Sequence, residues 1–192
     1  MQGLNTNNMK KITVLALGFM VAVGLSGCIK DRETFDPQAQ YQIEKPIIEE
    51  YATTELSNPQ FHEETGIWYQ ILNPGESGSY EYKIVNNQIE APTITVKYSG
   101  WLLNGTKFDE NQTDAGFKRS LGGVITAWQI AFLPQEIDGE DIGGLTVEGL
   151  QVGSKIRIVT PSYLAYGNQS SGNIPANSPL DFEIEVLDIV AP

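Results

Sequence analysis

The chain has 192 residues, of which 24 are acidic and 12 are Lys or Arg, so its formal net charge is −12 at pH 7. So acidic a surface repels the phosphates of nucleic acids, and no basic stripe interrupts it, which excludes a nucleic-acid-binding function. The single histidine, His62, excludes a His-rich metal site and argues against a Ser-His-Asp catalytic set. No phosphate-binding glycine loop is present either, so we expect neither a metal nor another cofactor.

The first 27 residues have the pattern of an export signal. A Lys-Lys pair precedes an uncharged apolar run over 12–25, shorter than the ~20 residues that a membrane-spanning helix needs. The run ends in LSGC (25–28), which resembles the lipobox of bacterial lipoproteins, where the cysteine takes a lipid and becomes the new N-terminus. We therefore expect a lipoprotein signal peptide over 1–27 and a lipid on Cys28. An uncleaved anchor with an incidental cysteine is the alternative.

This pattern predicts that the chain is exported and held by its lipid at the bacterial cell envelope. The outer membrane is the favoured location. The charged run 29–33 loosely resembles signals that send lipoproteins to the cell exterior, which leaves surface exposure open, although a solvated tether is the favoured explanation of the run. With one cysteine committed to lipid, no internal disulfide is expected, so the exported domain must be stable through its core alone.

Residues 28–58 are predicted to be a lipidated tether that contains one short amphipathic helix. The tether is polar to about residue 39, and the helix is expected over 41–56 with Pro46 near its first turn. Its expected apolar face is Ile47, Ile48, Tyr51 and Leu56.

Beyond Gly66 the apolar residues recur with a period of two, which is typical of strands with one buried face. The clearest case is the last, where Leu180, Phe182 and Ile184 alternate with acidic residues. Strands are expected over 67–72, 80–85, 94–99, 155–160 and 180–186.

A single helix is expected inside this β region, over 124–133, where Pro134 ends it. The acidic, glycine-rich stretch 135–149 is predicted to be a surface insertion. One short helix packed on a curved antiparallel sheet is an α+β fold, and we assign it to residues 59–192.

Three segments carry a family resemblance: VKYSGWLLNGTKFDEN (96–111), FKRSLGGVITAW (117–128) and PSYLAYGNQSSGNIPANSPLDFEIEVLDI (161–189). In order and spacing they resemble the FKBP-type peptidyl-prolyl cis-trans isomerases, over roughly residues 66–189. The resemblance implies an antiparallel sheet wrapped on one short helix, which agrees with the pattern of apolar residues.

The resemblance also implies an apolar pocket with Trp128 at its base. Asp109 matches the family's acidic residue beside the pocket, and Tyr166 matches the tyrosine whose hydroxyl bonds a ligand carbonyl. Ile174 matches the aliphatic residue that covers the proline. The residues implied for catalysis are Tyr98, Phe108, Asp109, Tyr166 and Phe182. Those implied for substrate binding are Phe117, Val124, Ile125, Trp128 and Ile174.

The implied activity is isomerisation of X-Pro bonds in exported polypeptides, as a folding helper. Proline-containing polypeptides are the expected partners, and a macrolide is a further ligand that the resemblance implies. The chain departs from the family at Arg119, Thr126 and Ala127, which leaves a non-catalytic binding module of an envelope complex as the alternative. Taken singly, the aromatic residues could also be ordinary core residues.

Overall fold

Strand β11 (Leu180–Val190) lies in the middle of the main sheet in a computed structural model, which describes residues 35–192. Its inner face buries Leu180, Phe182, Ile184 and Val186, as their alternation with acidic residues predicts. The predicted signal peptide and the predicted lipid on Cys28 lie outside the described residues.

The main sheet has seven strands in the order β1-β2-β10-β11-β5-β6, and β7 pairs with β5 as well. All of the pairings are antiparallel. The other strands are β1 (Gln60–His62), β2 (Ile67–Asn73), β5 (Thr93–Leu102), β6 (Lys107–Asn111), β7 (Phe117–Ser120) and β10 (Lys155–Thr160). β6 and β7 share one edge of β5, side by side, and this shared edge becomes part of the site described below.

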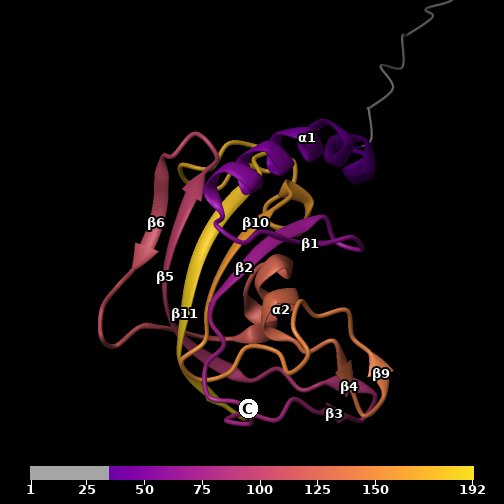
Figure 1. Cartoon of the computed structure of the whole chain (residues 1–192), viewed down its shortest axis with the longest axis vertical. Helices are drawn as coiled ribbons and strands as arrows, with labels where there is room; N and C mark the ends of the chain where they lie inside the picture. Colours follow the sequence, from indigo (N-terminus) through magenta and orange to yellow (C-terminus); the bar gives the residue numbers. More distant parts are fainter. Residues whose placement is uncertain (1–34) are drawn as a thin grey trace, which may run out of the picture. The chain divides into compact units, whose positions relative to one another are not determined.

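Helix α2 (Thr126–Phe132) lies against the inner face of the curved sheet and closes the main core (Figure 1). Its buried residues are Ala127, Trp128, Ala131 and Phe132. Two 3₁₀ turns, η1 (Leu121–Gly123) and η2 (Ser162–Leu164), connect the helix and β10 to their neighbours. The expectation of one short helix on a curved antiparallel sheet is confirmed for this part of the domain.

Helix α1 (Pro37–Glu55) is longer than predicted and packs on the sheet. It begins at Pro37 because the Asp36 side chain accepts hydrogen bonds from the backbone N–H groups of Gln38 and Ala39, at 2.9 and 3.2 Å. The prediction that Pro46 lies near the first turn is therefore wrong, because Pro46 lies inside the helix.

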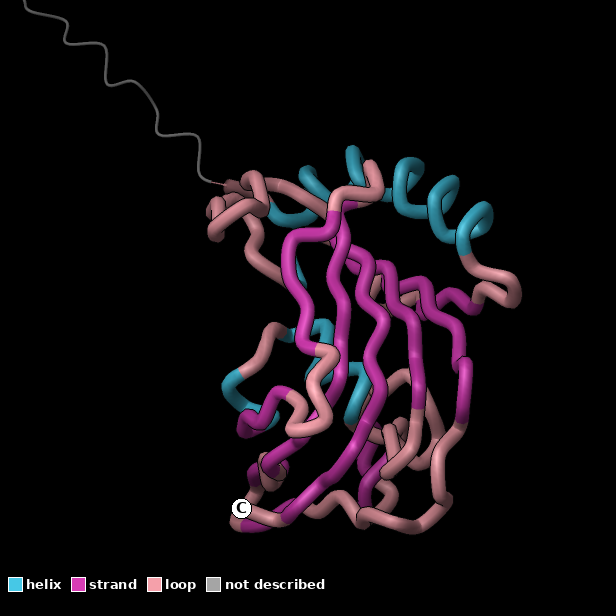
Figure 2. The backbone as a smooth tube through the Cα atoms, turned by 90° about the vertical axis from the view of Figure 1, so that its left-hand side faces the viewer, coloured by secondary structure: helices cyan, strands magenta, loops and turns pink. Residues whose placement is uncertain are grey.

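The buried face of α1 matches the predicted one in part, since Ile48 and Leu56 are buried and Tyr51 packs against them. Glu44, Ile48 and Ala52 are buried at a spacing of four residues, whereas Ile47 is 53% exposed. Ile48 and Ala52 pack with Val159 of β10, on the face of the sheet opposite the main core. In Figure 2 the long helix crosses the strands at one end of the sheet, while the short helix lies against a face. Within residues 35–192, no helix is long and apolar enough to span a bilayer.

The strand predicted over 80–85 is wrong except at its end. Only β3 (Ile84–Val85) is a strand, and it pairs with β4 (Gln88–Ile89) in a separate hairpin. Tyr82 is buried from a loop instead, because its hydroxyl donates to the Leu150 carbonyl at 2.8 Å. Alternating aromatic residues can thus be buried from a loop when side-chain hydrogen bonds replace the pairing of a β-strand.

The stretch 135–149 is only partly the surface insertion that was predicted. Its tip is a hairpin of β8 (Glu136–Ile137) and β9 (Glu140–Asp141), which is exposed except for Ile137, a residue of the main core. Its base belongs to the core, since Leu145 is 1% exposed and its carbonyl accepts a hydrogen bond from the Tyr69 hydroxyl at 3.0 Å. The acidic, glycine-rich composition predicts the tip correctly, but it gives no sign that the base of the stretch is buried.

Candidate active site

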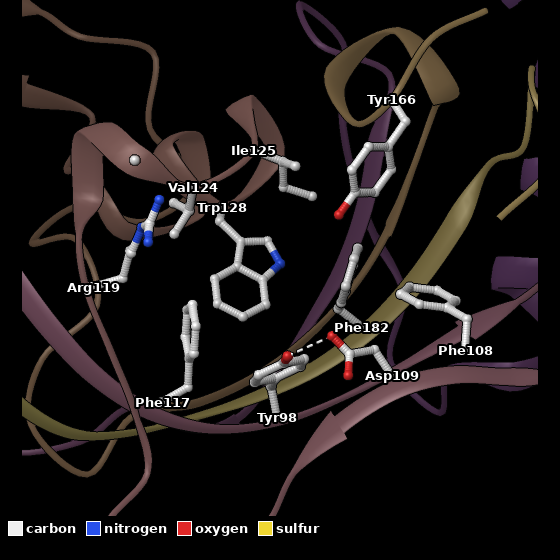
Figure 3. Close-up of a pocket in the computed structure, with 11 residues that line it drawn as sticks. Tyr98, Phe108, Asp109, Phe117, Arg119, Val124, Ile125, Trp128, Tyr166 and Phe182 are labelled. Carbon is white, nitrogen blue, oxygen red and sulfur yellow. Dashed lines mark hydrogen bonds between the residues drawn. The ribbon is translucent and has the colours of Figure 1, made fainter. Parts of the chain in front are cut away.

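A pocket of about 490 Å³ opens between α2 and the inner face of the sheet (Figure 3). Its walls come from β5, β6, β7, α2, β11 and the turn that follows η2. The lining residues are Tyr98, Phe108, Asp109, Phe117, Arg119, Gly123, Val124, Ile125, Trp128, Tyr166 and Phe182.

Strand register gathers the sheet residues of this pocket. Opposite residues in an antiparallel ladder share one face of the sheet. Gly100 of β5 lies opposite Phe182 of β11 on one side and Asp109 of β6 on the other. Farther along the same strand, Val96 lies opposite Phe117 of β7. The pocket therefore combines residues as far apart as Tyr98 and Phe182, because their strands are neighbours in the sheet.

A β-bulge in β6 brings two consecutive residues to the pocket. Gly100 pairs with Asp109 but the next residue, Trp101, pairs with Lys107, so Phe108 is the extra residue of the bulge. In a regular strand Phe108 and Asp109 would point to opposite faces. The bulge allows both side chains to line the pocket.

Trp128 is 4% exposed and forms the floor of the pocket by packing edge-on against three other rings. Its ring centroid lies 5.1 Å from that of Tyr98, 5.5 Å from Phe182 and 6.5 Å from Phe117, with interplanar angles between 78° and 88°. Such T-shaped pairs are favourable because the positive edge of one ring meets the negative face of another. The four rings thus fix one another's positions.

Two hydroxyls of the pocket remain protonated donors at neutral pH. The Tyr98 hydroxyl donates to Asp109 Oδ2 at 2.6 Å. The pKa of Tyr98 is raised, first by burial, then by this hydrogen bond and by the negative charge of Asp109. Burial, and then the Asp109 charge, also raises the pKa of Tyr166. In Figure 3 the Tyr166 hydroxyl points into the pocket, toward Asp109 and Trp128.

One buried donor in the pocket floor is unsatisfied within residues 35–192. The Trp128 Nε1 is buried and has no hydrogen-bond partner there. A buried unpaired donor is costly in a folded protein unless something else meets it. A ligand carbonyl in the pocket would supply such a partner.

The structure brings nine of the ten predicted pocket residues together. Ile174 is the exception, because its side chain is only 5% exposed and packs in the main core, while its backbone pairs with Ser171. Of the three departures from the family, Arg119 lines the pocket, Thr126 is exposed outside it and Ala127 is buried in the core. Arg119 is therefore the departure that changes a pocket wall.

Gly100 is a site residue that the sequence analysis did not identify. A Cβ at this position would lie 2.5 Å from Phe108 Cζ and 3.0 Å from Phe182 Cε1. Only glycine leaves room for these two rings, whose centroids are 5.5 Å apart. The glycine in VKYSGW was the available signal.

Residues 35–192 contain no cluster of three His, Cys, Asp or Glu side chains that could hold a metal ion. The described pocket offers a ligand aromatic walls, hydrogen-bond donors in Tyr166 and Trp128, one carboxylate and one guanidinium, while the Tyr98 hydroxyl already donates to Asp109.

Residues 87–187 match the family model described as FKBP-type peptidyl-prolyl cis-trans isomerase. The chain belongs to this family. The match covers β5 to β11 and with them every residue that lines the pocket. The FKBP-like fold expected from the sequence is confirmed.

Two named relatives illustrate the similarity. The FKBP-type peptidyl-prolyl cis-trans isomerase FkpA of Escherichia coli K12 is 28% identical over 159 residues, which are 79% of this chain and 50% of FkpA. FK506-binding protein 4 of Chaetomium thermophilum is 36% identical over 98 residues, which are 50% of this chain and 17% of that protein. The chain thus spans half or less of the length of these curated FKBP relatives.

Solved structures agree with this assignment. The crystal structure of FkpA from Escherichia coli matches with a TM-score of 0.57 at 25% identity, over 81% of this chain and 63% of that one. A peptidyl-prolyl cis-trans isomerase from Pseudomonas syringae matches with a TM-score of 0.54 over 78% of this chain and 96% of that one. At 22% identity the second structure supports the FKBP fold alone.

Replacing Gly100 by Ala should destabilise the fold by about 1–3 kcal/mol, because the new methyl group overpacks the rings of Phe108 and Phe182. Urea unfolding would measure the cost. Gly122→Ala is the matched control: its Cβ would meet nothing closer than 3.5 Å, so it should change stability little. Equal stability of the two variants would contradict the close approach at Gly100.

Proposed function

We propose that the domain catalyses cis-trans isomerisation of X-Pro bonds in polypeptides. The observation that supports this most is the aromatic pocket assembled around Trp128 from the segments that the FKBP family shares. Rotation about an X-Pro bond disrupts amide resonance against a barrier of about 18–20 kcal/mol, and no covalent bond is made or cut. Such a reaction needs neither a nucleophile nor a metal.

The pocket residues suit this reaction through their polarity. A twisted amide is less polar than a planar one, so apolar walls that exclude water favour the transition state over the ground state. We assign the proline ring to the floor at Trp128, between Phe117 and Phe182. The Tyr166 hydroxyl would then donate to a neighbouring carbonyl and hold the peptide while the imide turns.

The first test compares isomerisation of a short X-Pro peptide by the soluble domain with that by Trp128→Leu and Tyr166→Phe. We expect kcat/KM to fall about tenfold for Trp128→Leu, through the lost floor, and about threefold to tenfold for Tyr166→Phe, through one lost hydrogen bond. Circular dichroism would establish that each variant is folded.

Trp101→Leu is the matched control, because Trp101 lies on β5 outside the pocket lining and packs under Lys107 instead. It should keep wild-type turnover. A folded wild-type domain that does not accelerate the reaction would refute the enzymatic proposal.

Arg119 favours a second candidate function, a binding module that uses the same pocket without catalysis. Within residues 35–192 its guanidinium forms no ion pair, and it faces the pocket from the side opposite Asp109 (Figure 3). A charged wall hydrates the pocket and weakens its preference for a twisted amide. Binding of a proline-containing partner without turnover is the result that would support this candidate. FK506, named in several relatives, is a proposed ligand of the same pocket in either case.

Arg119 should also select peptides by charge. A peptide with Glu next to its proline would meet the guanidinium, whereas one with Lys would be repelled. Because the side chain is exposed, the preference should be only about twofold to fivefold in kcat/KM or in Kd. Arg119→Leu should abolish it, and Lys118→Leu, the exposed neighbour outside the pocket lining, should not. An unchanged preference in Arg119→Leu would show that residues other than Arg119 cause the charge selectivity.

We further propose that the chain is a lipoprotein of the bacterial cell envelope that assists the folding of exported proteins. The support is the LSGC motif at 25–28 and the similarity to FkpA of Escherichia coli. A lipid on Cys28 would attach the domain to a membrane, and several acyl chains would suffice for lasting attachment.

Metabolic labelling of the full chain with a fatty-acid analogue in a bacterium tests this attachment. The wild-type chain should take the label and fractionate with membranes, and Cys28→Ser should do neither. Ser26→Ala, which keeps a small residue in the motif, should behave as the wild type. Label that persists in Cys28→Ser would refute lipidation at this residue.

A further inference from the structure

Helix α1 forms a buried contact with the turn that carries Tyr166. Glu44 of α1 is 2% exposed, and its carboxylate accepts three hydrogen bonds. Ser162 N donates to Oε2 at 2.8 Å, Ser162 Oγ to Oε1 at 2.5 Å and Gln40 Nε2 to Oε1 at 2.8 Å. All three partners are donors, which is the arrangement that a buried carboxylate requires.

Ser162 transmits this contact to the residues on both sides of Tyr166. Its carbonyl oxygen accepts from the N–H groups of Ala165 at 2.9 Å and Gly167 at 2.8 Å. Gly167 has a positive φ of 56°, a conformation that suits glycine, and its own carbonyl accepts from Asn177 N at 2.7 Å. We call residues 162–167 the Tyr166 turn. A continuous path of hydrogen bonds therefore joins Glu44 to the backbone that aims Tyr166 into the pocket.

A second contact between the same elements involves two tyrosines. Tyr41 of α1 packs edge-on against Tyr163 of the Tyr166 turn, with ring centroids 5.7 Å apart. The Tyr163 hydroxyl donates to the Thr65 carbonyl at 2.7 Å. Gly66 leaves room for the Tyr41 ring, which would overlap any Cβ at that position. The turn is thus held by α1 through both a polar and an aromatic contact.

We propose that α1 sets the position of Tyr166 in the pocket and that Glu44 is the positioning residue. Glu44 is not a pocket residue and touches no ligand there; it acts through Ser162. The consequence for turnover rests on the proposed isomerase function, whereas the placement of Tyr166 does not. Glu44→Gln keeps the size of the side chain but replaces a charged acceptor by an amide. The amide either turns its NH₂ toward the Ser162 N–H and loses that bond, or keeps it only if the Ser162 hydroxyl and the Gln40 amide become acceptors. In both cases the bonds to a charged carboxylate, which are the stronger kind, are lost.

The decisive measurement is ¹⁹F NMR of the domain that carries 3-fluorotyrosine, with the Tyr166 signal assigned by Tyr166→Phe and the Tyr98 signal by Tyr98→Phe. In Glu44→Gln the Tyr166 signal should shift or broaden. The Tyr98 signal should stay unchanged, because Asp109 holds that hydroxyl. Glu50→Gln is the matched control, since Glu50 is on the exposed side of the same helix, and it should change neither signal.

An unchanged Tyr166 signal in folded Glu44→Gln would overturn the proposal. If Glu44→Gln does not fold, Ser162→Ala decides, because it removes the Oγ donor and retains the backbone N–H bond to Glu44. In that variant too the Tyr166 signal should move while the Tyr98 signal does not, and no movement would overturn the proposal.

Turnover provides the second readout. Glu44→Gln should lower kcat/KM about threefold to tenfold at a temperature at which the variant is fully folded, and it should cause little further loss in a Tyr166→Phe background. Equal losses in both backgrounds would mean that Glu44 affects turnover by a route other than Tyr166, which would overturn the proposal. If the wild-type domain has no turnover, the isomerase proposal fails, and the NMR result still decides the role of Glu44.

Discussion

The edge-to-face packing of Trp128 with Tyr98, Phe117 and Phe182 is the interaction on which the pocket depends. It joins α2 to β5, β7 and β11, elements that are distant in sequence. Because each ring is oriented by its neighbours, the pocket exists before any ligand enters, and little ordering remains to be done on binding. The glycine at position 100 leaves room for the rings of Phe108 and Phe182, and the bulge in β6 turns Phe108 toward the same pocket.

The elements predicted best are those whose own residues determine them. The alternation along β11 follows from its sequence, and Pro134 ends α2. Most of the pocket followed from the family resemblance, since three segments in order carry its residues. The features that were not predicted correctly depend on contacts with residues far along the chain. Glu44 looks like a solvated helix residue until Ser162, 118 positions later, is placed against it. Likewise, the sequence allows Ile174 either to cover the pocket or to fill the core, and its place in the core follows only from the conformation of its loop.

The two faces of the sheet are stabilised by different chemistry. The inner face is apolar, whereas on the outer face α1 adds a charged network to the apolar contact of Ile48 and Ala52. Arg157 Nη2 lies 2.7 Å from Asp181 Oδ2, and the Tyr51 hydroxyl donates to the same oxygen at 2.9 Å. Burial, followed by the Asp181 charge, raises the pKa of Tyr51 to about 12, so this donor persists at neutral pH. Removing one member of a buried pair typically costs 3–5 kcal/mol, because the other charge is left unpaired. Asp181 is adjacent to the pocket residue Phe182, so this network fixes the outer side of the strand whose inner side forms a pocket wall.

The shared edge of β5 has a consequence for how such a pocket can vary. β6 pairs with residues 98–101 and β7 with residues 93–96, so the ladder changes partner beside Tyr98, and the Gln112 side chain bonds the Tyr98 carbonyl at this junction, at 2.9 Å. A lengthened or shortened connection between the two strands would act on the pocket through Asp109 and Phe117, the lining residues on either side of it, and surface connections tolerate such changes in length. The edge of the sheet that carries these two pocket residues can therefore vary while β10 and β11 keep their pairings.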